Sequence, residues 1–128
     1  MLDTLRKIVQ DVTQEGNFAA SVQTLVSSVR SALGTEVCSI YLVSADRGGY
    51  VLAATQGLNQ AQIGQTVLSR SQGLVGLVGT RAEPLNLDTA PSHPSFFYVP
   101  EIGEEPFNSF LGVPIMHQGR VLGVLVVQ

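Results

Sequence analysis

Two apolar runs at the end of the chain constrain its fold more than any other feature. Residues 109–116 and 121–127 are apolar at odd and even positions alike, and the four residues 117–120 join them. A short, glycine-containing connection between two such runs predicts an antiparallel hairpin. Apolar residues on both sides predict strands that are covered on both faces. The sequence ends at Gln128, directly after the second run. We interpret this end as the edge of an N-terminal module cut from a longer protein.

Composition limits the classes of protein to which the chain can belong. Its 128 residues suit a single domain with a real core, and 45% of them are hydrophobic. The net charge of −3 argues against nucleic acid or an anionic membrane as a partner. A single cysteine excludes an internal disulfide and favours the cytoplasm, and two distant histidines predict no metal site. We find no signal peptide and no apolar run of membrane-spanning length, and we expect no cofactor.

The spacing of apolar residues predicts the order of helices and strands. Apolar residues at helical spacing predict a first helix over residues 2–15 and a second over 18–33, with Gly34 ending the second. Residues 46–49 form the expected turn of a hairpin. Helices followed by neighbouring antiparallel strands indicate the α+β class. The expected strands are 37–43, 50–55, 66–69, 85–87, 109–116 and 121–127, with a short helix over 74–81.

Residues 88–106 break this regularity. The segment contains four prolines, and five of the eight aromatic residues of the chain lie between positions 96 and 110. Loops of this length are uncommon in compact domains unless they have a function, and an exposed loop would not collect aromatic side chains. We therefore expect a lid that folds over the sheet. The alternative is that the segment only fills one face of the sheet, with no ligand beneath it.

Several short motifs resemble those of GAF domains, which are sensory modules related to PAS domains. The closing segment Phe110-Leu-Gly-Val-Pro-Ile115, followed after a hairpin by Leu122-Gly-Val-Leu125, resembles the end of a GAF domain. The glycine-rich block 73–79, followed by Glu83-Pro-Leu85, resembles the helix-to-strand segment of the same family. This resemblance implies a GAF-like antiparallel six-stranded sheet, with N-terminal helices on one face and a loop-covered pocket on the other. We expect one GAF domain over residues 1–128.

A narrower resemblance concerns GAF domains at the N-terminus of nitrogen-branch enzymes I of the bacterial phosphotransferase system. Residues 35–42, 73–79, 93–96 and 109–128 together are similar to these domains. The resemblance implies a regulatory domain that senses nitrogen status, with glutamine as the favoured effector. It also implies a phosphoenolpyruvate–protein phosphotransferase in C-terminal domains of the same protein. The phosphorylated histidine of that enzyme would lie outside this chain, so neither His93 nor His117 receives that role.

Polar and aromatic residues around the lid are the candidates for ligand binding. Asn86 and Asp88 end a short strand, where an amide and a carboxylate could hold a small polar molecule and its ammonium group. Capping of the following turn by Asp88 or Thr89 is the alternative. His93 either contacts the ligand or braces the loop. The full set of candidate ligand-binding residues is Tyr41, Asn86, Asp88, His93, Phe96, Phe97 and Tyr98.

The remaining reactive residues argue against catalysis by this domain. Cys38 lies within an apolar strand and is predicted to pack as a small hydrophobic residue rather than to act as a nucleophile. GAF domains that reduce methionine sulfoxide need a second thiol, which this chain lacks. The glycines at 73, 76 and 79 have no following lysine, so they indicate close helix–sheet packing instead of a phosphate loop. The domain itself is therefore not expected to be an enzyme, and Arg70 and Arg81 are expected at the surface.

The first predicted helix also suggests an assembly. Leu2, Leu5, Val9 and Val12 are spaced 3-4-3, as in the seam of a short coiled coil. The same spacing fits a helix that packs on its own domain. Because the second helix already has a complete apolar stripe, we favour a homodimer that pairs through the first helix. The alternative function of the chain is accordingly a ligand-free GAF module used for dimerisation or interdomain contacts.

Overall fold

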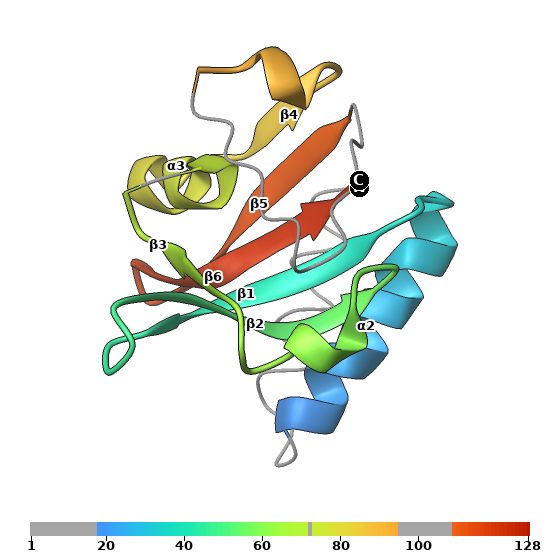
Figure 1. Ribbon diagram of the computed structural model, residues 1–128, viewed down its shortest axis with the longest axis horizontal. Coiled ribbons are helices and arrows are strands. Elements are labelled where there is room, and N and C mark those ends of the chain that lie inside the picture. Colours follow the sequence, from blue (N-terminus) through green and yellow to red (C-terminus); the bar gives the residue numbers. More distant parts are fainter. Residues whose placement is uncertain (1–17, 72, 95–108) are drawn as a thin grey trace.

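A six-stranded antiparallel sheet with helices on its two faces forms the framework of the domain (Figure 1). The computed structural model describes residues 18–71, 73–94 and 109–128, so the predicted helix over 2–15 and most of the predicted lid lie outside it. The strand order is β3-β2-β1-β6-β5-β4, which places β1 and β6 at the centre. The elements are α2 (Phe18–Leu33), β1 (Cys38–Ser44), β2 (Gly49–Gln56), η1 (Gln60–Gln62), β3 (Val67–Ser69), α3 (Gly73–Arg81), β4 (Leu85–Leu87), η2 (Ala90–Ser92), β5 (Phe110–His117) and β6 (Arg120–Val127).

Helix α2 confirms the helix expected over residues 18–33. Its buried residues Val22, Leu25, Val26 and Val29 recur at helical spacing and face the sheet. The helix ends at Gly34, which has a positive φ of 65° and donates its backbone N–H to the carbonyl of Arg30 at 2.9 Å. A glycine adopts this left-handed conformation without a steric penalty, so its place after the last turn fixes where the helix stops.

The β5–β6 hairpin confirms the prediction from the closing apolar runs. Its turn residues Gln118 and Gly119 both have positive φ, of 50° and 76°, which matches the right-handed twist of the strands. Burial on both faces holds for residues 124–127 of β6. It is wrong at the tip of the hairpin, where Met116 is 42% and Leu122 is 36% exposed. Neither residue belongs to either core cluster, because the tip lies past the packed part of the sheet.

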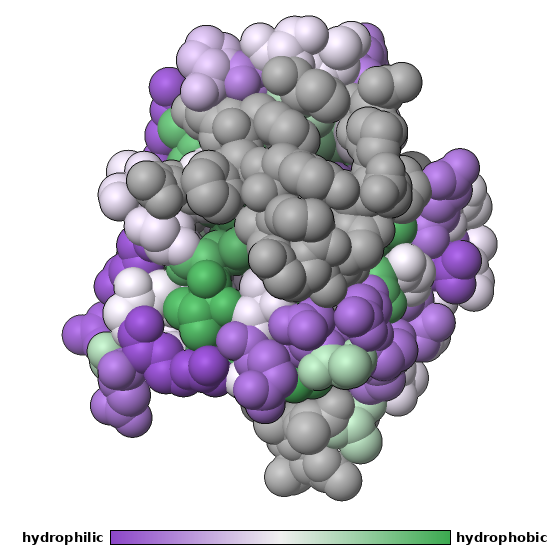
Figure 2. All heavy atoms as spheres, viewed as in Figure 1, coloured by the Kyte–Doolittle hydropathy of each residue, from purple (hydrophilic) through white to green (hydrophobic). Residues whose placement is uncertain are grey.

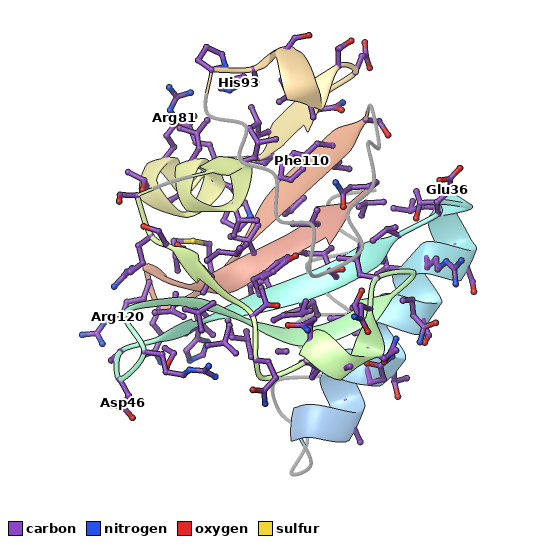
Figure 3. All side chains as sticks on the ribbon, viewed as in Figure 1. Glu36, Asp46, Arg81, His93, Phe110 and Arg120 are labelled. Carbon is purple, nitrogen blue, oxygen red and sulfur yellow. The ribbon has the colours of Figure 1, made fainter. Side chains whose placement is uncertain are left out.

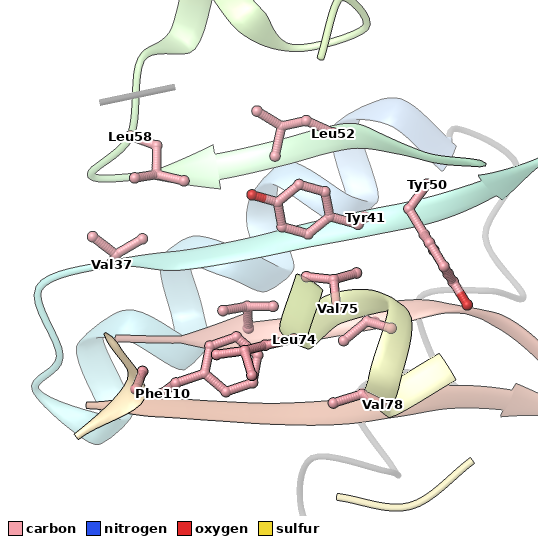
Figure 4. Close-up of a cluster of buried hydrophobic side chains, with 12 residues drawn as sticks. Val37, Tyr41, Tyr50, Leu52, Leu58, Leu74, Val75, Val78 and Phe110 are labelled. Atoms are coloured by element: carbon pink, nitrogen blue, oxygen red, sulfur yellow. The ribbon is translucent and has the colours of Figure 1, made fainter. Parts of the chain in front are cut away.

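Two separate clusters of buried side chains cover the two faces of the sheet. We call the face that packs against α2 the α2 face and the opposite one the α3 face. Alternation along β1 sends Cys38 and Ile40 to the α2 face and Tyr41 to the α3 face. The α2-face cluster contains Val22, Leu25, Val26, Val29, Cys38, Ile40, Ala54, Ile115, Leu125 and Val127. The α3-face cluster, shown in Figure 4, contains Val37, Tyr41, Tyr50, Leu52, Leu58, Leu74, Val75, Val78, Ala90, Phe110, Val124 and Val126.

The glycines of α3 let this helix approach its neighbours closely, as the sequence predicted. A Cβ atom at Gly79 would lie 2.7 Å from Cζ of Tyr50, closer than carbon atoms approach one another. A Cβ atom at Gly76 would lie 2.9 Å from the backbone oxygen of Arg70. Close packing therefore explains both glycines without a bound phosphate. Within the described residues, no helix combines the length and the apolar character that crossing a membrane requires.

Candidate small-molecule site

The α3 face is the side of the sheet on which the predicted pocket should lie. Tyr41 stands near its centre on β1, is 3% exposed, and belongs to the same cluster as Phe110 of β5. Figure 4 shows both rings on this side of the sheet, with Val75 and Val78 of α3 nearby. The space-filling view shows a small apolar area on this side of the molecule, with polar side chains further out (Figure 2). Small-molecule sites usually combine an apolar lining with a few polar groups, so this face is the candidate.

Asn86 lies on the other side of the sheet from Tyr41. Its neighbours Leu85 and Leu87 pack against the α3-face cluster. Side chains alternate along a strand, so Asn86 stands on the α2 face. Its register partner Leu111 packs against the α2-face cluster, which agrees with this placement. The structure therefore does not bring Asn86 and Tyr41 together.

Asp88 lies at the end of β4, between the sheet and η2. Its side chain is exposed, and its carboxylate makes no hydrogen bond to the part of the chain that the structure describes. Thr89 occupies the N-cap position of η2, but its side chain makes no capping hydrogen bond, so that prediction is wrong. A capping side chain accepts a hydrogen bond from the second or third N–H of the helix. The second residue is Pro91, which has no N–H, and the N–H of the third, Ser92, donates to the backbone oxygen of Thr89 at 3.2 Å instead.

His93 follows η2, and its ring is half-buried. Its backbone N–H donates to the carbonyl of Ala90 at 3.0 Å, which closes η2 at its C-terminal end. Figure 3 shows His93 at the same end of the molecule as Arg81, the last residue of α3. Asp88 and His93 thus come from one short segment after the edge strand β4, and β5 and β6 lie between this strand and Tyr41 on β1. Phe96, Phe97 and Tyr98, like the lid that they belong to, lie outside the described residues.

A pair of buried hydroxyl groups on the α3 face was missed by the sequence reasoning. Ser39 of β1 and Thr55 of β2 are register partners, both are 0% exposed, and their hydroxyl oxygens lie 2.8 Å apart. The backbone oxygen of Thr55 also accepts hydrogen bonds from the side-chain amides of Gln23 at 3.1 Å and Gln60 at 2.5 Å. The available signal was a hydroxyl residue inside each of two otherwise apolar strands.

The single thiol is inert, as predicted. Cys38 is 0% exposed within the α2-face cluster, and burial raises its pKa to about 12. At neutral pH the group remains a protonated thiol, which is neither a nucleophile nor a metal ligand. The face that holds Cys38 is also opposite to the candidate site. Burial, and the raised pKa that follows from it, therefore argue against nucleophilic chemistry by this cysteine.

The arginines near the candidate site have different roles. Arg70 and Arg81 are exposed at the two ends of the α3 region, which confirms their expected place at the surface. Arg47, in the β1–β2 turn, donates from its guanidinium to the backbone oxygens of Gly64 and Gln65. This fork joins the β1–β2 turn to the segment between η1 and β3, so Arg47 braces the border of the α3 face.

The comparisons with known proteins agree with this architecture. A protein of Escherichia coli strain K12, named phosphoenolpyruvate-dependent phosphotransferase system, is 47% identical over 121 residues. These residues are 94% of this chain but only 16% of that protein.

Two solved structures resemble the chain along nearly its whole length. The GAF domain of a Coxiella burnetii phosphoenolpyruvate–protein phosphotransferase has a TM-score of 0.86 at 45% identity, covering 99% of this chain and 76% of that one. The corresponding GAF domain from Acinetobacter has a TM-score of 0.84 at 48% identity, covering 99% and 75%. The family model of the GAF domain matches residues 17–128, and the chain therefore belongs to the GAF domain family.

Proposed function

We propose that this domain is a regulatory sensor that binds a small molecule and controls a C-terminal phosphoenolpyruvate–protein phosphotransferase in the same, cytoplasmic protein. The main support is the identity of 45–48% with GAF domains of such phosphotransferases over 99% of the chain. The inert thiol of Cys38 favours binding over catalysis. The sensing role and the enzyme that it regulates are both inferred from the relatives.

The proposed effector is a free amino acid, with glutamine favoured as a signal of nitrogen status. Such a ligand needs one group for its ammonium end and one for its carboxylate end. The exposed carboxylate of Asp88 suits the ammonium group, since charge-assisted hydrogen bonds are strong and directional. Tyr41 and His93 would contact the rest of the ligand, and the aromatic residues Phe96, Phe97 and Tyr98 are proposed as apolar walls. The placement of Asn86 on the α2 face favours a structural role for that residue.

Calorimetric titration with L-glutamine tests this assignment. Asp88→Asn removes the charge at nearly constant size and is expected to weaken binding by about 10- to 100-fold, as the loss of a charged hydrogen bond predicts. Asp46→Asn is the matched control, because Asp46 is exposed in the β1–β2 turn at the far end of the molecule from His93 (Figure 3). Unchanged affinity in Asp88→Asn would remove Asp88 from the site. No binding by the unmodified chain would reject glutamine as the effector.

A second function has one observation in its favour. The α3-face cluster is closely packed by the domain's own side chains, including Tyr41 and Phe110 at 3% exposure each. A ligand-free module used for dimerisation or interdomain contacts would need such packing and no pocket. Phosphoryl transfer from phosphoenolpyruvate, measured in the complete protein with and without L-glutamine, separates the two functions. A rate that changes with glutamine supports the sensor, and a rate that depends only on the presence of the domain supports the module.

We also propose that the protein is a homodimer paired through its first helix. The supporting pattern, Leu2, Leu5, Val9 and Val12, belongs to residues that the structure does not describe. Light scattering of the chain and of a Leu5→Glu/Val12→Glu double variant provides the test. The unmodified chain is expected to be dimeric at micromolar concentration and the variant monomeric but folded. A monomeric parent, or a variant that still dimerises, would refute the proposal.

A further inference from the structure

An apolar row crosses the sheet on the α3 face, at the end where the β5–β6 hairpin turns. It begins with Leu68 of β3, whose register partner in β2 is Tyr50. Tyr50 in turn pairs with Val43 of β1. All three belong to the α3-face cluster or pack against it. The antiparallel pairing of β1 with β6, extended by one position, then places Leu122 of β6 beside Val43.

Two exposed residues of the hairpin, Leu122 and Met116, complete the row. Leu122 lies two residues before Val124 of the α3-face cluster, so alternation puts it on the same face. Met116 directly follows Ile115 of the α2-face cluster, so it also stands on the α3 face. A register shift leaves Leu122 without a partner in β5, as in a β-bulge. Met116 is 42% and Leu122 is 36% exposed, and in the described part of the chain only Val67 is a further exposed large hydrophobic residue.

Helix α3 covers the middle of the row and leaves the hairpin end bare. Gly79 of this helix packs against the ring of Tyr50, which is 2% exposed. Val43 and Leu68 are half-buried. Figure 2 shows an apolar area where β3 and the beginning of β6 lie in Figure 1, with polar side chains around it. An exposed apolar patch with a polar rim is typical of protein–protein interaction sites.

The rim of the row is positively charged. Arg70 directly follows β3, Arg120 begins β6, and Arg47 lies in the turn between β1 and β2. All three are exposed, and Asp46 of the same turn, seen near Arg120 in Figure 3, is the acidic residue beside them. Three arginines and one aspartate give this rim a net charge of +2, whereas the whole chain carries −3. A local excess of positive charge favours an acidic partner.

We propose that the apolar row and its arginine rim bind an acidic, amphipathic helix of the phosphotransferase part of the same protein. This inference rests on the proposed function and deepens it, because a regulatory domain must contact the enzyme that it controls. The matched region is only 16% of the Escherichia coli relative, so most of such a protein lies outside this domain.

The dimensions of the row agree with a helix as its partner. Strands in a sheet lie about 4.8 Å apart, so a row across five strands is about 19 Å long, the length of about 13 residues of α-helix. Apolar residues at helical spacing on the partner would meet Leu122 and Met116. Carboxylates beside that stripe would meet Arg70 and Arg120 at the two ends of the row.

Hydroxyl-radical footprinting of the isolated chain and of the complete protein tests the contact. The thioether of Met116 is readily oxidised when it is exposed. Its modification rate should fall about fivefold in the complete protein, because docking would bury most of a side chain that is 42% exposed. Equal modification in the two proteins would overturn the proposal. Protection that develops in the isolated chain as its concentration rises would assign the row to a second copy, and would also overturn it.

Leu122→Glu and Val67→Glu are a matched pair of variants for the complete protein. Both residues are 36% exposed and lie outside the core clusters. Val67 stands on the α2 face, because its neighbour Leu68 packs against the α3-face cluster. Leu122→Glu places a carboxylate against an acidic helix and should restore the modification of Met116 to its rate in the isolated chain. Val67→Glu should leave Met116 protected.

The outcomes of these variants decide between docking and a merely structural effect. Urea unfolding of the isolated chain should give both variants the same stability. Protection of Met116 that survives Leu122→Glu, or that is lost equally in Val67→Glu, would overturn the proposal. Arg120→Glu tests the charge alone and should also expose Met116, more so at high salt, since salt screens the remaining attraction. A charge reversal without effect would overturn the acidic character of the partner.

Failure of this inference and failure of the sensing function give different results. Footprinting needs no effector, so a complete protein that ignores L-glutamine but protects Met116 would reject the sensor and support the docking surface. A phosphoryl-transfer rate that responds to L-glutamine while Met116 stays fully accessible would support the sensor and overturn the docking surface.

Discussion

The α2 face and the α3 face belong to one sheet but are built from different side chains. On the α2 face, the cluster is aliphatic apart from the thiol of Cys38. On the α3 face, the cluster includes Tyr41, Tyr50 and Phe110, and the buried Ser39–Thr55 pair lies among them. Aliphatic side chains contribute mainly burial, whereas phenol rings and hydroxyls add hydrogen bonds with fixed directions. The proposed recognition of a small molecule is accordingly assigned to the α3 face, while the α2-face cluster offers burial alone.

The helices follow the same division. Helix α2 packs on β1 and β2 through a continuous stripe of branched aliphatic residues. Helix α3 is only nine residues long and has glycines where it meets Tyr50 and the backbone of Arg70. Three larger residues of α3, Leu74, Val75 and Val78, are buried in the α3-face cluster and fasten the helix to the sheet. The α2 face is thus covered by a long helix with an aliphatic stripe, and the α3 face by a short helix in which glycines alternate with buried aliphatic residues.

The largest expected effect comes from truncating a matched leucine on each face. The pair is Leu125 on the α2 face, which is 1% exposed, and Leu52 on the α3 face, which is 0% exposed. Changing either leucine to Ala should lower the unfolding free energy by about 3 kcal/mol. Only Leu52→Ala is expected to weaken glutamine binding as well, because only that cavity opens beneath the proposed site. Denaturant unfolding and calorimetry on both variants provide the measurement. Equal losses of affinity would contradict the division between the faces.

Helix α3 can be tested through its contact with Tyr50. Gly79→Ala places a methyl group against the phenol and should lower the unfolding free energy by about 2 kcal/mol. Tyr50→Phe removes the hydroxyl, the atom nearest to the new methyl group, so the double variant should recover part of that loss. Urea unfolding of the four proteins forms a double-mutant cycle. Strictly additive losses would show that α3 moves away instead of pressing on Tyr50.

The thiol on the α2 face gives a pH-dependent effect of intermediate size. Burial raises the pKa of Cys38 from 9.0 to about 12. Between these values the unfolded chain releases the thiol proton and the folded chain retains it, so stability falls as the pH rises above 9. By pH 10 the loss attributable to this group is about 1.4 kcal/mol. Cys38→Ala should have a shallower decline between pH 8 and pH 10, and identical slopes would mean that water reaches the thiol.

The smallest expected effect concerns the border of the α3 face. Arg47→Ala removes the guanidinium fork to Gly64 and Gln65 and should cost about 0.5–1 kcal/mol, because these hydrogen bonds are exposed. Arg120→Ala, at an exposed arginine that begins β6, is the control and should change nothing measurable. Hydrogen exchange of residues 62–66 should accelerate in Arg47→Ala alone. The same exchange in both variants would mean that the fork does not hold this segment.

Local patterns in the sequence predicted the framework well. The apolar periodicity and Gly34 gave α2 its bounds, and the apolar runs around residues 117–120 gave the closing hairpin. These features depend on residues that are close together in the sequence and belong to one helix or hairpin, so they can be recognised without knowing the tertiary structure. Cys38 was read correctly for the same reason, since an apolar strand already implies burial.

The candidate site was harder to predict because it depends on which elements become neighbours. The face of the sheet on which Asn86 stands depends on the pairing of β4 with β5. These strands are far apart in the sequence, so local patterns do not predict which side chains share a face. The Ser39–Thr55 pair likewise exists only through the register of β1 and β2. The failed cap at Thr89 is different, because Pro91 was visible in the sequence and its missing N–H could have excluded that role.

The two outermost strands of the sheet have a consequence for handling the protein. β3 (Val67–Ser69) and β4 (Leu85–Leu87) are only three residues long, and they occupy both edges. β3 pairs only with residues 49–51 of β2, and β4 pairs only with residues 110–112 of β5, so among the described strands none pairs with the outer side of residues 113–117 of β5. Pro114, which has no N–H, interrupts this uncovered stretch. Short edges leave too few hydrogen-bonding groups for edge-to-edge polymerisation. We expect concentrated solutions of the folded domain to resist fibril formation, and shaking or seeding to produce fibrils only after the edges have been lengthened or the sheet unfolded.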